Sequence, residues 1–216
     1  MITLSNISKS YKSVVLDNIS LNCHKGEVFC IAGANGSGKS TLLSIMTGLI
    51  KPDSGSVVCP GRIGYVPQDN GLFENISVKD NIDFWAKARN QKSDYSFFSE
   101  RDLKKKVAHL SAGIKKKLSI HIAVSSGYDF LILDEPSTSL DLVYQKFIID
   151  LINESKEKNK GVVFTSHNVT EIQQSDTLCI LDAGNIAYNG NTRDFCDAEN
   201  FQEKLYGIIL KNAAAQ

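Results

Sequence analysis

The sequence predicts an α/β fold with a mostly parallel β-sheet. From residue 130 onward, short apolar runs alternate with helical patterns, which is typical of buried strands covered by helices on both faces. Nearer the start, the apolar run 28–32 leads into a glycine-rich loop and then a helical pattern. Residues 70–125 are mainly helical in pattern and interrupt this alternation, so we expect them to be an insertion.

Length and composition fit one domain over residues 1–216, with the insertion inside it. The 24 Lys and Arg balance the 24 Asp and Glu, so there is no overall basic field and nucleic acid is not an expected partner. Five cysteines without paired spacing favour a reduced, cytosolic and metal-free protein. We find neither an apolar run of about 18 residues nor a signal-peptide pattern, so we expect no membrane span.

Alternating apolar and polar segments predict the first strands. Residues 2–8 and 14–21 alternate between polar turns, and we expect them to form an N-terminal antiparallel β subdomain. The run 28–32 predicts a buried strand. The helix after the glycine-rich loop is expected over residues 41–48, and two further strands over 55–59 and 63–66.

The insertion is predicted to contain three helices, over residues 77–89, 100–108 and 112–124. Ser77, with Asp80 three positions later, is typical of a capped helix start. The third helix carries an apolar stripe at four-residue spacing, Ile114, Leu118 and Ile122. The three lysines 115–117 are expected to lie partly on its other side.

After the insertion, strands and helices alternate again. The predicted strands are residues 130–133, 161–166 and 177–181. The predicted helices are residues 142–157, 169–174 and, at the end of the chain, about 195–211.

Residues 33–41 fit G-x-x-x-x-G-K-[ST], the phosphate-binding loop, in the strand–loop–helix context that this motif requires. Glycines allow successive N–H groups to face phosphate oxygens, and the following helix adds its positive N-terminal end. Lys39 would reach the β- and γ-phosphates, and the Ser40 hydroxyl would hold Mg²⁺. The sequence therefore predicts a P-loop NTPase core, with these nucleotide-binding residues: Gly33, Asn35, Gly36, Ser37, Gly38, Lys39, Ser40 and Thr41.

A second apolar run, residues 130–133, ends in Asp134 and Glu135. This places both acids at the carboxyl edge of the sheet, beside the phosphate loop. Asp134 is suited to orient Mg²⁺ through its hydration shell. Glu135 is suited to polarise the water that attacks the γ-phosphate. Together the two motifs predict an ATPase or a GTPase.

Five further features narrow the family: Tyr11 before the loop, Gln68 after a strand, residues 110–114 with the sequence LSAGI, residues 139–141 with the sequence SLD, and His167 at a strand end. In order and spacing, this set resembles the ATP-binding subunit of ABC transporters. The resemblance spans nearly the whole chain, from Tyr11 to about Gly190.

The resemblance implies a role for each matching residue. Tyr11 would stack on adenine, and Gln68 would contact Mg²⁺ or the attacking water. Ser111 and Gly113 would bind the γ-phosphate of ATP held by the opposite subunit, with Asp141 at the dimer interface and His167 on the γ-phosphate. The implied catalytic residues are Glu135, His167, Gln68 and Lys39, and the implied metal ligands are Ser40, Gln68 and Asp134.

The resemblance also implies ATP and Mg²⁺ as cofactors and a place at the cytoplasmic face of the cell membrane. The partners would be a separately encoded transmembrane permease subunit and a second copy of the chain or a homologous ATPase subunit. Residues 70–125 would form the helical, or signature, subdomain that receives the permease. The candidates for lining the groove that receives the permease are Leu72, Phe73 and Trp85. Packing inside the subdomain would explain these apolar side chains equally well. Residues 63–88 look most like the branch that exports drugs, antimicrobial peptides or similar cargo.

The chain departs from the family pattern in its signature. Ala112 and Ile114 stand where Gly and Gln are usual, so we expect a weakened contact with the opposite subunit's ATP. Because Glu135 and His167 are intact, we still expect hydrolysis. One alternative is a regulatory or weakly active subunit of a heteromeric complex. Another is a soluble ABC-type ATPase acting on DNA or ribosomes, but the chain lacks room for the coiled coils or second ATPase domain of those relatives.

Overall fold

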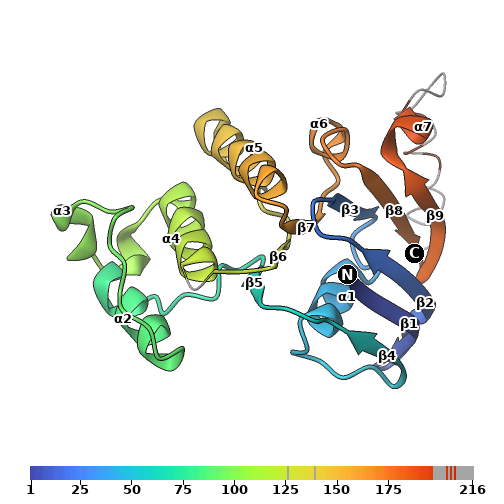
Figure 1. Ribbon diagram of the computed structural model, residues 1–216, viewed down its shortest axis with the longest axis horizontal. Coiled ribbons are helices and arrows are strands. Elements are labelled where there is room, and N and C mark those ends of the chain that lie inside the picture. The colour runs from blue at the N-terminus through green and yellow to red at the C-terminus, as the bar shows by residue number, and fades with distance from the viewer. Residues whose placement is uncertain (126, 139, 197–202, 204, 206, 208–216) are drawn as a thin grey trace.

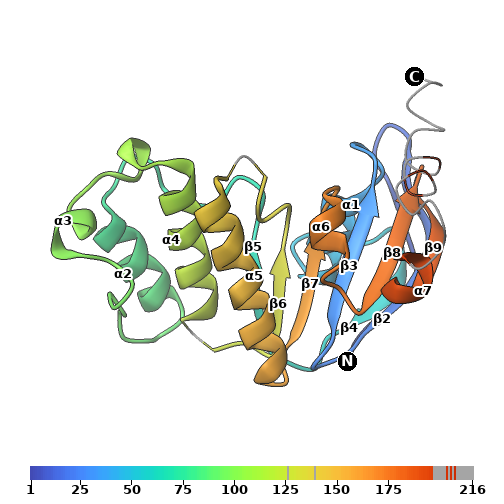
Figure 2. The ribbon, with the colours of Figure 1, turned by 90° about the horizontal axis from the view of Figure 1, so that it is seen from above.

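A computed structural model describes residues 1–125, 127–138 and 140–196, together with residues 203, 205 and 207. Its larger sheet has six strands in the order β5-β6-β7-β3-β8-β9 (Figure 2). These strands are Ile63–Val66, Phe130–Leu133, Gly161–Thr165, Val28–Gly33, Thr177–Asp182 and Asn185–Asn191. The first five pair in parallel and β9 pairs antiparallel with β8, which confirms the mostly parallel sheet.

A separate three-stranded antiparallel sheet has the order β2-β1-β4, with β1 over Ile2–Ser10, β2 over Val14–Cys23 and β4 over Ser54–Val58. It lies with α1 (Lys39–Met46) on one side of the large sheet, as Figure 1 shows. The expectation of an N-terminal antiparallel β subdomain is confirmed. β4, from beyond the phosphate loop, completes it.

The four central strands of the large sheet, β6, β7, β3 and β8, are buried on both faces, which explains their uninterrupted apolar runs. In β3, Phe29 and Ile31 face the core shared with α1 and the small sheet. Val28 and Cys30 face the second core, shared with α5 (Leu142–Glu157), α6 (Val169–Ile172) and α7 (Thr192–Cys196). Hydrophobic cores on both faces of the sheet therefore hold these strands in place.

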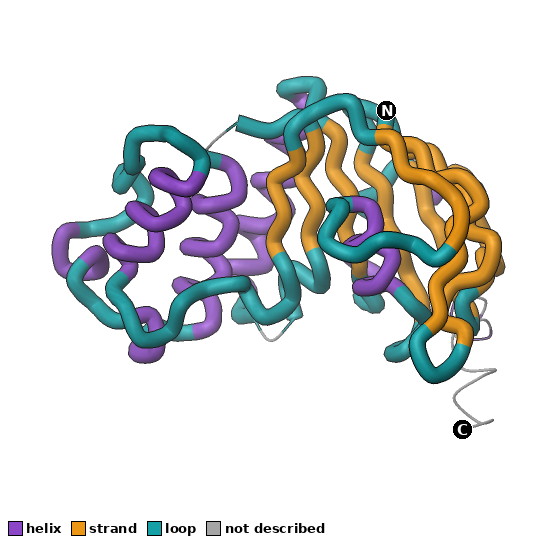
Figure 3. Tube along the Cα trace, turned by 90° about the horizontal axis from the view of Figure 1, so that it is seen from below, coloured by secondary structure: helices purple, strands orange, loops and turns teal. Residues whose placement is uncertain are grey.

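The helical insertion stands beside β5 at one end of the large sheet (Figures 1 and 3). It contains α2 (Val78–Ala88), α3 (Glu100–Leu103), the short 3₁₀ helix η1 (Val107–His109) and α4 (Ala112–Val124). The expected apolar stripe of α4 packs here, with Leu118 and Ile122 buried and Ile114 partly buried. Within the described residues, none of the helices is long and apolar enough to cross a membrane.

One expected helix of the insertion is wrong. Residues 100–108 do not form a continuous helix, because α3 ends at Leu103. The backbone after it pairs instead with residues 74–78: the Val107 N–H donates to the Ile76 carbonyl, and the Val78 N–H to that of Lys105, both at 3.0 Å. Such pairing between distant segments leaves no mark on local periodicity.

The C-terminal third also differs in detail. α6 ends at Ile172, two residues before the expected end, and β9 had no predicted counterpart. The expected final helix, residues 195–211, falls mostly outside the described residues. The helix that the structure describes there, α7, begins earlier, at Thr192, and Leu205 is buried in the second core.

Candidate nucleotide site

The phosphate-binding loop joins β3 to α1, and its shape depends on glycine. Gly38 precedes α1 with a φ of 103°, a backbone conformation that side chains rarely adopt. A Cβ on Gly33 would lie 2.4 Å from the Leu181 carbonyl oxygen, so the loop leaves the sheet where only glycine fits. These two residues set the entry and the exit of the loop.

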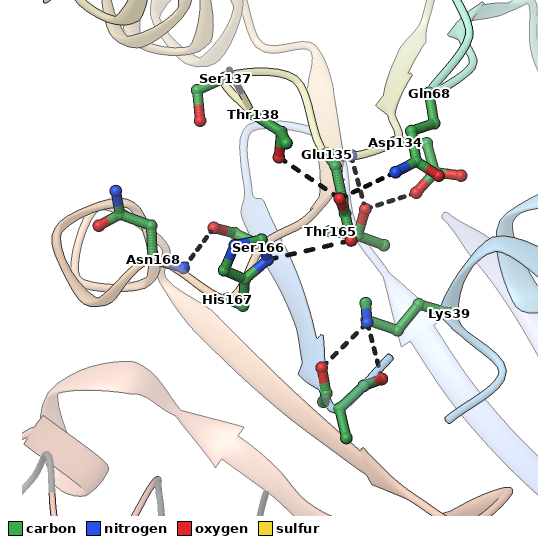
Figure 4. A network of polar contacts seen from close by, with 12 residues as sticks. Lys39, Gln68, Asp134, Glu135, Ser137, Thr138, Thr165, Ser166, His167 and Asn168 are labelled. Atoms are coloured by element: carbon green, nitrogen blue, oxygen red, sulfur yellow. Dashed lines mark hydrogen bonds and ion pairs between the residues drawn. The ribbon is translucent and has the colours of Figure 1, made fainter. Parts of the chain in front are cut away.

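Lys39 closes the loop from inside. Its Nζ donates to the carbonyl oxygens of Gly33 and Ala34, each at 2.9 Å (Figure 4). The side chain is 5% exposed. Burial lowers the pKa of Lys39, and the nearby carboxylates Glu135 and Asp134 act in the opposite direction. The ammonium is thus held at the base of the loop, where an anionic ligand would provide further compensation.

A cavity of about 640 Å³ opens over this loop. Most of the predicted nucleotide-binding and catalytic residues line it together, namely Tyr11, Asn35, Gly36, Gly38, Lys39, Ser40, Thr41, Gln68, Glu135 and His167. Val15 and Thr138 also line it and were not predicted. Ser37 is buried, and its Oγ has no hydrogen-bond partner among the described atoms. The volume is within the range of about 300–1,000 Å³ usual for small-molecule sites.

Glu135 lies at the centre of a polar network at the cavity wall (Figure 4). The Gln68 Nε2 donates to Glu135 Oε2 at 3.1 Å, and the Thr138 hydroxyl donates to the same oxygen at 3.4 Å. His167 Nδ1 lies 3.9 Å from Glu135 Oε1. Glu135 itself has a φ of 43°, an uncommon conformation of the kind that clusters at functional sites. Gln68, Glu135 and His167, predicted separately, are therefore neighbours.

Thr165 supports the two acids, and the sequence analysis missed it. Its hydroxyl donates to Asp134 Oδ1 at 2.7 Å and accepts from the Glu135 N–H at 2.8 Å. Thr165 ends β7, the strand beside β6, and Asp134 is only 2% exposed. The available signal was a polar residue at the carboxyl end of a neighbouring parallel strand.

The three residues predicted as metal ligands share one space. Ser40, Gln68 and Asp134 line a cavity of about 390 Å³ next to the first. A hydroxyl, an amide oxygen and a carboxylate are oxygen ligands of the kind that Mg²⁺ prefers. The donor set therefore fits the cation.

Ser111, Gly113 and Asp141 do not line the cavity at Lys39. Ser111 caps α4 and accepts the Ile114 N–H, and Asp141 caps α5 and accepts the N–H groups of Val143 and Tyr144. Gly113 is buried against Tyr144, whose ring a Cβ would meet at 2.3 Å. Within one copy these residues are separate from the phosphate loop. Ser139, from the same SLD stretch as Asp141, is outside the described residues.

Comparison with known proteins agrees with this geometry. The ABC transporter family pattern matches residues 16–138. An uncharacterised ABC transporter ATP-binding protein of Methanocaldococcus jannaschii is 32% identical, over 97% of this chain and 85% of the relative. The linearmycin resistance ATP-binding protein of Bacillus subtilis is 30% identical, over 91% and 71%. The lantibiotic transport ATP-binding protein of Streptococcus pyogenes is 29% identical, over 97% and 98%.

Solved structures show the same fold. A dimeric ATP-binding cassette in a post-hydrolysis state, bound to ADP and Pi, superposes with a TM-score of 0.81. It is 24% identical, and the match covers 89% of this chain and 99% of that one. The phosphate loop, the acids that follow β6 and the family match lead to one conclusion: the chain belongs to the ABC transporter family, as an ATP-binding subunit.

Proposed function

We propose that this chain, as a single ATP-binding domain over residues 1–216, hydrolyses Mg-ATP to power an export complex in the cell membrane. The observation that carries the proposal is the position of the Glu135 carboxylate. It accepts a hydrogen bond from the Gln68 amide at 3.1 Å and borders the same cavity as Lys39. A base and a phosphate-binding cation on one cavity are the parts that phosphoryl transfer to water requires.

Each residue of the cavity would have a distinct task. The Lys39 ammonium and the N–H groups at the start of α1 would bind the β- and γ-phosphates. Tyr11, 59% exposed at the cavity rim, would stack on adenine. Glu135 would accept a proton from the attacking water while Gln68 and His167 orient the reacting groups. Mg²⁺, held by Ser40, Gln68 and Asp134, would neutralise charge on the phosphates.

We propose that a second ATPase subunit completes the site, either another copy or a homologue. Ser111 and Gly113 lie at the N-terminal end of α4, whose positive dipole and N–H groups suit a phosphate. Because neither residue lines the cavity of its own copy, they are assigned to the ATP of the partner. Asp141 would lie at the contact between the two copies.

The permease would dock in a groove between the large sheet and the helical insertion. This cavity of about 410 Å³ has mainly apolar walls. Leu72 and Trp85 line it and also pack against the insertion's core, so their positions are compatible with both explanations offered from the sequence. Phe73 does not line it but stacks on Trp85 at 6.3 Å. We infer that a cytoplasmic segment of a separately encoded permease occupies this groove, which places the chain peripherally at the cytoplasmic face.

The cargo class follows from the relatives alone. Two of them are named for linearmycin resistance and lantibiotic transport. By analogy, we infer a drug-like, peptide or lipid-like cargo that the permease selects.

ATP turnover by the purified complex tests the proposal. We expect the complex with its permease to hydrolyse ATP, and the Glu135→Gln variant to bind ATP with turnover lowered by about 100-fold or more. Wild-type turnover no higher than that of the variant would refute hydrolysis.

A weakly active, regulatory subunit is the second candidate, and Ile114 favours it. Its hydrocarbon side chain has no amide to offer to a partner's ATP, and it packs, partly buried, against the insertion's core. Turnover by the isolated chain distinguishes the two candidates. A regulatory subunit would become active only beside a second, different ATPase subunit.

A further inference from the structure

The loop that carries Gln68 is attached to the signature helix α4. Ser119 Oγ donates to the Asn70 carbonyl oxygen at 2.7 Å. One turn nearer the start of the helix, Lys116 Nζ lies 3.3 Å from the Pro67 carbonyl oxygen and 3.4 Å from that of Gln68. Residues three positions apart share a helix face, so these two side chains hold the loop along one edge of α4.

Lys116 is unusual among the three lysines of α4. It is 5% exposed, whereas the sequence predicted that the three lysines lie partly on the side of α4 away from its apolar stripe. Lys115 forms an ion pair with Glu74 at 2.8 Å, and Lys117 Nζ lies over the ring of Phe97 at 5.5 Å. A buried ammonium is costly unless it is hydrogen-bonded, and the carbonyl oxygens of Pro67 and Gln68 supply those hydrogen bonds, so Lys116 and the Gln68 loop hold each other in place.

The contact links two parts of the proposed mechanism. At one end, α4 begins with Ser111 and Gly113, the residues assigned to the partner's ATP. At the other end, the side chain of Gln68 donates to Glu135. Lys116 lies between them, because it binds the backbone of Gln68 from the second turn of α4.

We propose that Lys116 is a positioning residue for ATP hydrolysis: it fixes the Pro67–Gln68 backbone to α4 and thereby keeps the Gln68 amide on the Glu135 carboxylate. A shift of α4 on contact with ATP across the dimer would then move Gln68. This inference rests on the proposed function, since it assigns Lys116 to the hydrolysis step. It adds a residue that does not itself touch the nucleotide.

Steady-state kinetics of the complex with its permease provide the first test. Lys116→Met keeps the approximate length of the side chain but removes all of its hydrogen-bond donors. We expect it to lower kcat about 10-fold while KM for ATP changes less than about 3-fold. Lys116→Arg keeps charge and donors and should recover part of the loss. Lys117→Met, one position along the same helix, is the matched control and should retain wild-type kcat. Equal kcat for Lys116→Met and Lys117→Met would overturn the inference.

A double-mutant cycle separates positioning from general stability. If Lys116 acts through Gln68, Lys116→Met should have little further effect on kcat in a Gln68→Ala background. The same fold-loss in both backgrounds would refute that route. Should Lys116→Met not fold, Lys116→Gln, which removes the ammonium and shortens the side chain but stays polar, replaces it in the cycle with the same two outcomes.

Trp85 offers a spectroscopic readout, because it is the only tryptophan and lines the groove beside Pro67, Asn70 and Ser119. We expect Mg-ATP to change its emission in the wild type and in Lys117→Met, and to change it less in Lys116→Met. An unaltered response in Lys116→Met would count against the inference. If the wild type itself lacks turnover, the proposed function fails. If the wild type hydrolyses ATP but the Lys116 variants have the same kcat and Trp85 response as Lys117→Met, this inference fails and the proposed function stands.

Discussion

Thr165 shows how a single hydroxyl supports the chemistry of its neighbours. It both donates to the buried carboxylate of Asp134 and accepts from the backbone of Glu135. The first contact compensates a carboxylate that is 2% exposed. The second helps to hold the backbone of Glu135 at its uncommon φ of 43°. The two acids are therefore oriented by β7, the strand that also leads to His167.

Replacing this hydroxyl should affect both stability and catalysis. Thr165→Val is nearly isosteric but leaves Asp134 Oδ1 and the Glu135 N–H without their partner. We expect the free energy of unfolding to fall by about 1–3 kcal/mol, measured by urea denaturation, and kcat to fall with it. Thr170→Val, at an exposed threonine of α6, is the control and should change neither. A Thr165→Val protein as stable and active as the control would contradict this account.

Asp83 in α2 should make the insertion sensitive to acid. Burial raises the pKa of Asp83, but hydrogen bonds from Lys79, Ser93 and Tyr95 outweigh it and hold the pKa at about 2. The pKa in the unfolded chain is about 3.9, so the folded state favours the charged form. Its contribution to stability is present above that value and is lost as the pH falls towards 2.

Denaturation of wild type and Asp83→Asn at several pH values tests this linkage. The difference between their free energies of unfolding should be constant near neutral pH and should shrink between about pH 5 and pH 2. A difference that stays the same across this interval would show that the carboxylate is not specifically stabilised.

Among the elements, α2 depends on its N-terminal cap. The Ser77 Oγ accepts the Asp80 N–H at 3.1 Å, and the Asp80 carboxylate accepts the Ser77 N–H at 3.3 Å. This capping box satisfies two backbone groups that the helix leaves without partners. The cap residue Ser77 also lies within residues 74–78, the segment that pairs with residues 105–108.

Removing the cap should destabilise the insertion. We expect Ser77→Ala to lower the free energy of unfolding by about 0.5–2 kcal/mol, measured by thermal or urea denaturation. Lys87→Ala, on the exposed side of the same helix, should change it by less than about 0.5 kcal/mol. Equal effects of the two substitutions would mean that the cap does not limit stability.

Local sequence periodicity predicted some of the helices and strands and missed others. Strong periodicity gave α4, β6 and α5 with the bounds that the structure has. The helix expected over residues 100–108 was wrong, because residues 105–108 hydrogen-bond to a segment about thirty positions earlier. Lys116 belongs to the three lysines expected to lie partly away from the apolar stripe, and it is buried against the Gln68 loop. Periodicity reports which residues share a face, but not which distant segment covers it.

The residues of the site also fall into those that the sequence could identify and those that only the fold shows. Residues in contiguous motifs, such as Lys39 and Glu135, were identified because their spacing carries the chemistry. Gln68 and His167 came from the family resemblance, and the structure brings them beside Glu135. Thr165 and Lys116 carry no motif. Each acts through a contact between elements far apart in the chain, so only the fold shows it.

At the scale of the whole molecule, the proposed function depends on the separation of the Lys39 loop from Ser111. The cavity at Lys39 belongs to the large sheet, whereas Ser111 stands at the start of α4 in the insertion and does not line that cavity. One copy therefore has its phosphate-binding loop on one part and the N-terminus of α4, capped by Ser111, on the other. Two copies placed head to tail would bring each loop to the other's helix.

The state of association of Glu135→Gln with Mg-ATP tests this claim most directly. The variant should bind ATP without hydrolysing it, so the bridged pair should accumulate. In sedimentation or light-scattering measurements we expect a dimer with saturating Mg-ATP and a monomer without it, and we expect Ser111→Arg to abolish the dimer. A Glu135→Gln protein that remains monomeric with saturating Mg-ATP, even beside its permease and any homologous ATPase subunit, would contradict the account.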